Sequence, residues 1–197
     1  MDLEKIKSDF LKTNPKDIYM NYLQGNEVWY FSEHLQKADH SKYYDDFKRF
    51  VASNLGVNFN DICIVGSCKL GYSLAPHKKF SPFHAESDMD LVLVSNSYYN
   101  KFWDAYFDLY NQRANIDYKF IANSIFRRFI SIKNPEPIHP IITDWITKVE
   151  KFNKDYQTLF DIKQEINYRI YNSWESVERY HLKGLTELQD QLRKSTK

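Results

Sequence analysis

Apolar and polar residues follow a strand-like pattern in three short segments of the chain. Residues 62–65 are all apolar, which is typical of a buried strand. Residues 88–94 pass from acidic positions into an apolar run, and residues 162–171 alternate so that one face is apolar and the other polar. In the last segment the apolar face holds Ile166, Tyr168 and Ile170, and the polar face holds Glu165, Asn167 and Arg169. These three segments predict a small sheet.

Helical spacing dominates most of the remaining sequence. Residues 3–55 read as helices with breaks at Asn14-Pro15 and near Gly25, and Gly56 is the expected C-cap of the last one. The run Ser95-Asn96-Ser97 supplies N-cap chemistry for an aromatic helix that carries apolar residues up to Tyr110. Further helices are predicted at residues 67–74, 120–132, 144–151 and 173–192, and three prolines predict a loop at residues 134–140.

The predicted fold class is therefore α/β (α+β), a small mixed β-sheet covered by helices, with helical segments at both ends. We expect residues 1–56 to form a helical segment packed on a core domain of residues 57–197, in one compact domain overall. High aromatic content (15 Tyr, 14 Phe, 4 Trp) and only 5 Gly favour a helix-rich, well-packed protein.

Charge and hydropathy exclude some classes of protein. The net charge of +1 argues neither for nor against nucleic acid, so any such site would be a local patch. No apolar run approaches the ~18 residues that span a bilayer, and the N-terminus lacks the apolar core of a signal peptide. We therefore expect a cytoplasmic protein without a membrane partner. Cys63 and Cys68 are expected as small buried residues.

The residues with the clearest chemistry are two acidic positions and a small turn. Asp88 and Asp90 stand two residues apart in a predicted strand, so both carboxylates project from one face. Such a pair suits a hard cation, Mg²⁺ or Mn²⁺, that also takes phosphate oxygens. Gly66 and Ser67 follow the first strand, and backbone N–H groups at such a turn form an anion site.

This arrangement resembles the DNA-polymerase-β-like nucleotidyltransferase superfamily, whose signature is Gly-Ser after a hydrophobic strand and Asp-x-Asp on the next. The resemblance covers residues 62–95 and implies a sheet of the nucleotidyltransferase type. The segment at residues 75–86 is longer than the family usually shows. The third carboxylate that many members carry on a later strand has no obvious counterpart. Glu165 is the first candidate for it, followed by Asp117 and Asp161.

Several cations and histidines near the motif have two possible interpretations. Lys69 would lie in the helix after the turn and neutralise phosphate charge, or be an exposed lysine. Lys78 and Lys79 would close over a triphosphate or lie in a solvated loop, and His77 and His84 are more often loop histidines than metal ligands. The arginines at 127, 128 and 169 suit phosphate or surface ion pairs equally well.

The resemblance implies a metal-dependent nucleotidyltransferase that moves an NMP from a nucleoside triphosphate onto a hydroxyl of RNA, protein or a small molecule. Small stand-alone members of the superfamily are often bacterial toxin or defence components. The alternative is the same fold with a degenerate site, a module that binds a nucleotide or a partner without turnover. A third possibility is an interaction protein in which the motif is accidental.

Overall fold

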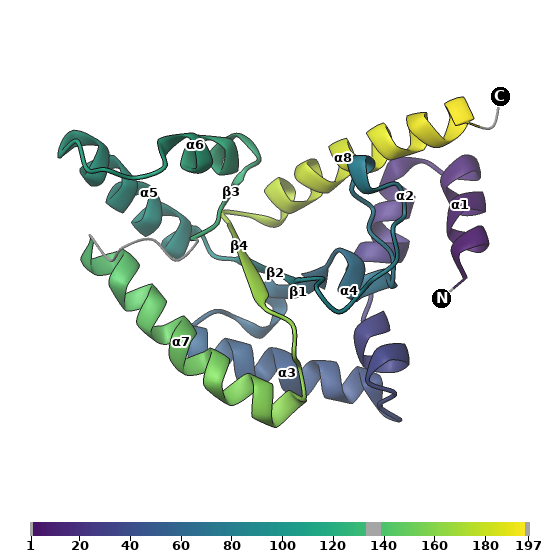
Figure 1. The fold of residues 1–197 in the computed structure, drawn as a ribbon, viewed down its shortest axis with the longest axis horizontal. Helices are drawn as coiled ribbons and strands as arrows, with labels where there is room; N and C mark the ends of the chain where they lie inside the picture. The colour runs from purple at the N-terminus through teal and green to yellow at the C-terminus, as the bar shows by residue number, and fades with distance from the viewer. Residues whose placement is uncertain (1, 133–138, 196–197) are drawn as a thin grey trace.

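In the computed structural model, residues 2–132 and 139–195 are described, and this part of the chain holds one open four-stranded sheet (Figure 1). Its strands are β1 (Ile62–Val65), β2 (Met89–Val94), β3 (Phe129–Ile130) and β4 (Ile166–Tyr171). The order across the sheet is β1-β2-β4-β3, with β2 and β4 parallel and the other two pairs antiparallel. The sheet is therefore mixed, and the predicted α/β class is confirmed at that level.

Helices cover both faces of the sheet, as the alternation of its residues requires. The face that carries Ile64 and Leu91 packs on α3 (His40–Leu55), α5 (Asn96–Asn111) and α7 (Pro140–Phe160). The opposite face, with Val65 and Val92, packs on α8 (Trp174–Ser195). Asp90 belongs to this second face, because it lies two residues from Val92 along β2.

The N-terminal helices pack against the C-terminal helix. They are α1 (Leu3–Lys12) and α2 (Pro15–Tyr19). The π-helical turns η1 (Met20–Gln24) and η2 (Tyr30–His34) come next along the chain, and η2 packs on α3 and α4 instead. Ile6 and Phe10 share a buried cluster with Leu185 and Leu188 of α8. The amide of Gln189 donates to the carbonyl oxygens of Phe10 and Thr13 at 2.6 and 2.7 Å. The first helices of the chain consequently lie beside its last helix, α8 (Figure 1).

Three predicted helix ends are confirmed by their caps. Asn14 accepts a hydrogen bond from the Asp17 N–H and starts α2, with Pro15 as its first residue. Gly56 ends α3 in the left-handed region at φ 68°. The Ser95 hydroxyl accepts from the Tyr98 N–H and caps α5. Local chemistry alone fixes these boundaries.

Other predicted helices have different bounds. The helix expected at 67–74 is the four-residue α4 (Ser67–Leu70), because Gly71 takes a left-handed conformation and ends it. The helix expected at 120–132 is α6 (Tyr118–Phe126), and β3 follows it. The short helix expected at 144–151 is part of the 21-residue α7. The predicted loop at 134–140 lies mostly outside the described residues.

The long segment between the motif halves is packed against the protein. It contains the short 3-10 turn η4 (Pro76–Lys78), like η3 (Phe59–Asp61) before β1. The Phe83 N–H donates to the Gly71 carbonyl oxygen at 2.8 Å, and the Phe83 ring contacts Trp29 and Tyr30. Residues 75–86 are therefore held by the N-terminal segment and not only by their own ends. No described helix is both long and apolar enough to cross a membrane.

Candidate functional site

The turn after β1 brings Gly66 into contact with Asp90, the second residue of the acidic pair. Gly66 has φ 74° and ψ −152°, a backbone conformation that is essentially restricted to glycine. Val65 pairs with Asp90 across the antiparallel strands. A Cβ atom on Gly66 would lie 2.8 Å from the Asp90 Oδ2 atom, closer than real Cβ contacts. The glycine is therefore required by both its backbone and its neighbour.

Each aspartate is held by a side chain from β4. Asn167 donates its amide to Asp88 Oδ2 at 2.8 Å, and Arg169 donates to Asp90 Oδ1 at 2.8 Å. Asn167 is the register partner of Asp90 in the parallel pair. The polar face predicted for residues 165–169 thus does meet the acidic pair.

Besides its bond to Asp90, Arg169 contacts Tyr180 of α8 and Phe129 of β3. Its second terminal nitrogen donates to the Tyr180 hydroxyl at 3.3 Å, and its guanidinium lies 5.4 and 5.6 Å from the ring centroids of Phe129 and Tyr180. Its side chain and that of Asp90 are each 21% exposed. Cation–π contacts and the ion pair together compensate for placing a charge in this partly buried position.

The two members of this ion pair influence each other's protonation. Burial raises the pKa of Asp90, while the charges of Arg169 and Lys78 act in the opposite direction. Burial disfavours the charged form of Arg169, but the Asp90 carboxylate together with Tyr180 and Tyr171 outweighs burial, so the pKa of Arg169 is raised. Lys78, exposed in the packed segment at 75–86, therefore lies close enough to act on Asp90.

The hydrogen bonds leave one oxygen of each carboxylate without a polar partner among the described residues. Asp88 Oδ2 and Asp90 Oδ1 are engaged, so Asp88 Oδ1 and Asp90 Oδ2 remain. Of these two oxygens, Asp90 Oδ2 lies beside the Gly66 turn. A carboxylate pair of this kind suits one hard cation that completes its coordination with water or phosphate oxygens. Within the described residues, no group of three or more His, Cys, Asp or Glu side chains could hold a metal ion.

Lys69 lies away from this arrangement. It is 2% exposed, and its ammonium donates to the carbonyl oxygen of Gly25. Burial lowers the pKa of Lys69 to about 8. Ser67, by contrast, begins α4 directly after Gly66 and is half-buried. Of the two predicted phosphate contacts beyond the glycine, the structure therefore brings Ser67 to the turn and gives Lys69 a different partner.

The three candidates for a third carboxylate also lie apart from a common cluster. Glu165 is exposed just before β4, and its backbone carbonyl accepts from the Met89 N–H at 2.8 Å. Asp117 caps α6 by accepting from the Phe120 N–H, and Asp161 ends α7 in a left-handed conformation. The structure gives no contact between any of these side chains and the acidic pair.

Sequence reasoning placed Asn167 on the correct face but gave it no role. The signal was available, because Asn167 and Arg169 repeat the two-residue spacing of Asp88 and Asp90 on another strand. What the sequence could not supply was the register that sets one pair beside the other.

Comparisons of the chain with protein-family models, with curated proteins and with solved structures found no match. The site therefore has to be interpreted from its own geometry.

Proposed function

We propose that this protein is a magnesium-dependent nucleotidyltransferase with a single-metal site at Asp88 and Asp90. The observation that carries the proposal is the contact between the Asp90 carboxylate and the Gly66 turn. It supports the proposal because a phosphate held at this turn and a cation held by Asp90 would be neighbours. These are the two elements that moving a nucleotidyl group requires.

The donor atoms fit one Mg²⁺ (or Mn²⁺) ion. Asp88 Oδ1 and Asp90 Oδ2 would hold it, since their partner oxygens already accept from Asn167 and Arg169. Mg²⁺ commonly uses one or two carboxylates and takes its other ligands from water and substrate phosphates. When bound, the ion would supply charge stabilisation at the transferring phosphorus. Because Arg169 supplies a fixed positive charge at Asp90, a second metal is not part of the proposal.

The chain's own residues would bind and orient the triphosphate. The backbone at Gly66 and Ser67 would hold phosphate oxygens, because the glycine has no Cβ that would block their approach. Lys78 would add positive charge from the packed segment. An acceptor hydroxyl would attack the α-phosphorus in line and release its proton to water. The bond to the oxygen that bridges to the β-phosphate would break, and pyrophosphate would leave.

A second candidate function is nucleotide binding without turnover. It is favoured by β4, where the positions beside the acidic pair are Asn167 and Arg169 and neither is a carboxylate. A site of this kind would bind a metal–nucleotide complex and lack a group to activate the acceptor hydroxyl. RNA, protein and small molecules remain equal candidates for the acceptor.

The deciding experiment follows label from each of the four α-³²P nucleoside triphosphates, with Mg²⁺ or Mn²⁺, into total RNA, lysate protein and the protein itself. The test variant is Asp88→Ala/Asp90→Ala. The matched control is Asp104→Ala/Asp190→Ala, which removes two exposed carboxylates from helices. Thermal unfolding of each variant confirms that it is folded.

Label that forms with wild type and the control but disappears in the test variant supports nucleotidyl transfer and identifies the acceptor class. No label, together with magnesium-dependent ATP binding that the test variant loses, supports the binding module. No label and no binding contradicts both functions.

A further inference from the structure

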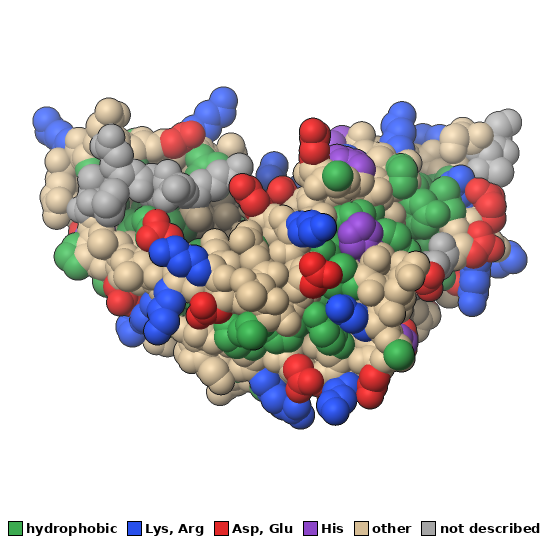
Figure 2. All heavy atoms as spheres, turned by 60° about the horizontal axis from the view of Figure 1, so that its bottom comes forward, with side chains coloured by type: hydrophobic (Ala, Val, Ile, Leu, Met, Phe, Trp, Pro, Cys, Tyr) green, Lys and Arg blue, Asp and Glu red, His purple; other side chains and the backbone are tan. Residues whose placement is uncertain are grey.

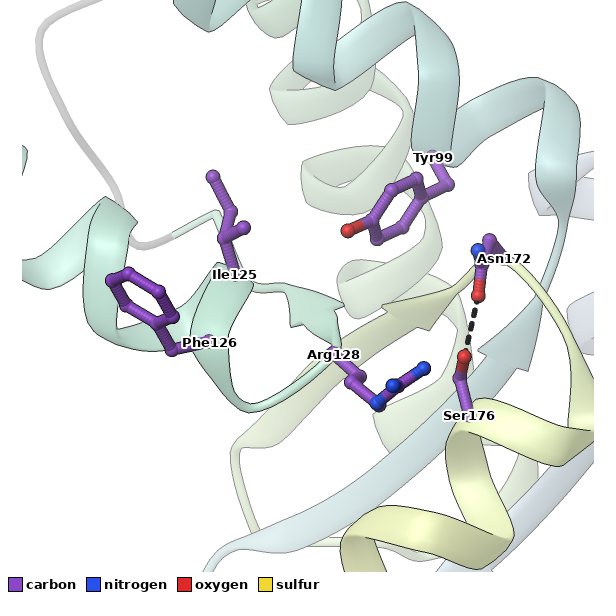
Figure 3. Close-up of a pocket in the computed structure, with 6 residues that line it drawn as sticks. All are labelled: Tyr99, Ile125, Phe126, Arg128, Asn172 and Ser176. Carbon is purple, nitrogen blue, oxygen red and sulfur yellow. Dashed lines mark hydrogen bonds between the residues drawn. The ribbon is translucent and has the colours of Figure 1, made fainter.

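A polar pocket lies at the end of the sheet opposite to the acidic pair. It has a volume of about 300 Å³ and is lined by Tyr99, Ile125, Phe126, Arg128, Asn172 and Ser176 (Figure 3). Asn172 directly follows β4, whereas Asp88 and Asp90 lie where β2 begins. About 15 Å of strand therefore separates the two sites. Ligands of open α/β sheets generally bind at this carboxyl end of parallel strands.

Arg128 is the charged residue of the pocket. It has φ 67°, a left-handed conformation that helix ends usually give to glycine. Among the described residues, its guanidinium has neither an ion pair nor a side-chain hydrogen bond. Figure 3 shows it directed toward the side of the pocket formed by Asn172 and Ser176. An unpaired guanidinium facing a pocket suits an oxyanion, which it can bind through two parallel N–H groups.

The other polar groups of the pocket add donors. The Asn172 side-chain oxygen accepts from the Ser176 hydroxyl at 2.7 Å, which leaves its amide nitrogen on the side of Tyr99 (Figure 3). The Tyr99 hydroxyl is directed into the pocket. The residue before Ser176, Glu175, carries a carboxylate. This carboxylate forms an ion pair with Arg179, with 3.1 Å between Glu175 Oε1 and Arg179 Nε. The pocket therefore offers donors from three separate parts of the chain, and none of its described lining residues carries a carboxylate.

Helix ends add to the preference for an anion. Ser176 is the third residue of the 22-residue α8, and Tyr99 is the fourth residue of the 16-residue α5. The N-terminal turns of two long helices thus contribute to the wall of one pocket, and each carries partial positive charge. Phe126, which is 87% exposed at the pocket, provides a flat apolar surface on which a base would stack.

We propose that this pocket binds a phosphate group of a nucleotide or of an RNA strand, with Arg128, Tyr99 and Asn172 as donors. The proposal is independent of nucleotidyl transfer, because it uses other residues at the other end of the sheet. Either of the two proposals, the phosphate pocket or nucleotidyl transfer, can be wrong while the other is correct.

The test measures binding of three probes in the presence of EDTA: inorganic phosphate, AMP and a fluorescein-labelled ten-nucleotide RNA. The variants are Arg128→Gln, Tyr99→Phe and Phe126→Ser, with Arg127→Gln as the matched control. Arg127 is also exposed and carries the same charge, but it does not line the pocket. Isothermal titration calorimetry serves for the first two probes and fluorescence anisotropy for the RNA.

We expect Arg128→Gln to weaken binding about tenfold or more, and Arg127→Gln by less than about threefold, because only Arg128 faces the bound phosphate. Tyr99→Phe should weaken all probes, and Phe126→Ser should weaken AMP and RNA but not inorganic phosphate. RNA that binds far more tightly than AMP identifies a strand as the ligand, and similar affinities identify a free nucleotide. No binding by wild type, or equal losses in the two arginine variants, overturns the proposal.

Discussion

The Asp90 carboxylate lies against the bare Cα of Gly66, so that a methyl group there would come within 2.8 Å of its Oδ2 atom. The glycine also has φ 74° and ψ −152°, where other residues are strained. Figure 2 shows one face of the molecule, on which acidic and basic side chains are interspersed without one dominant patch. The specific chemistry of this chain is thus expected from local arrangements such as this contact, and not from its overall charge.

Gly66→Ala should lower the free energy of unfolding by about 3 kcal/mol, because backbone strain of about 1–3 kcal/mol adds to the clash with Asp90. Gly184→Ala is the matched control, since its Cβ would meet nothing closer than 3.9 Å within α8. That change should raise stability by about 0.5–1 kcal/mol through helix propensity. Urea unfolding measures both. Equal stability of the Gly66 variant and wild type would contradict the described turn.

Arg169→Met should destabilise the protein by about 3 kcal/mol at pH 7, because it leaves the Asp90 carboxylate partly buried without its ion-pair partner. Adding Asp90→Asn should recover a large part of the loss, which a double-mutant cycle in urea measures. Arg179→Met is the control, because its pair with Glu175 is exposed and should contribute less than about 1 kcal/mol. Strictly additive losses at 90 and 169 would argue against the coupling.

The strands and the glycine turn could be predicted from the sequence because their signals are local. Apolar runs and two-residue alternation identified β1, β2 and β4, and cap residues identified the ends of α3 and α5. The two-residue strand β3 gave no such signal. It forms because Phe129 and Ile130 pair with the edge of β4, and a segment that short carries no alternation of its own.

Contacts between distant segments were beyond sequence reasoning for a related reason. The hydrogen bond of Lys69 to Gly25 and the packing of Phe83 on Trp29 join segments separated by more than 40 residues. The sequence around Lys69 or Phe83 contains no local pattern from which the distant contact partner could be predicted. The sequence therefore indicated either a phosphate contact or an exposed side chain for Lys69, and it left the placement of residues 75–86 open.

Asn167→Asp should strengthen divalent metal binding, because it places a third carboxylate at the register position of Asp90. We expect Mn²⁺ affinity to rise at least about tenfold in calorimetry, since each added carboxylate supplies both charge and a ligand. Without metal, the variant should unfold at a lower temperature than wild type, because Asp88 loses its donor and gains a like charge. Asn111→Asp, at the exposed end of α5, is the control for the added charge. Unchanged Mn²⁺ affinity would place the metal elsewhere.

The buried ammonium of Lys69 predicts a specific pH dependence of stability. Its pKa falls from 10.5 in the unfolded chain to about 8 in the folded protein, because burial disfavours the charge. The unfolded state therefore binds more protons between pH 8 and 10.5, and the lysine's contribution to stability increases as pH rises through that window.

Comparison with Lys69→Met isolates this contribution up to pH 10. The one cysteine that Lys69 acts on, Cys63, has its pKa raised by burial to about 12 and stays protonated in the folded protein over that range. The stability of wild type relative to the variant should increase from pH 8 to 10.5 by up to about 3 kcal/mol, since one pKa unit corresponds to about 1.4 kcal/mol. Urea unfolding at pH 7.5, 9 and 10 measures the trend, and Lys101→Met, at an exposed position, should show none. A difference that stays constant with pH would mean that Lys69 keeps an ordinary pKa, as a solvent-facing lysine at the phosphate turn would.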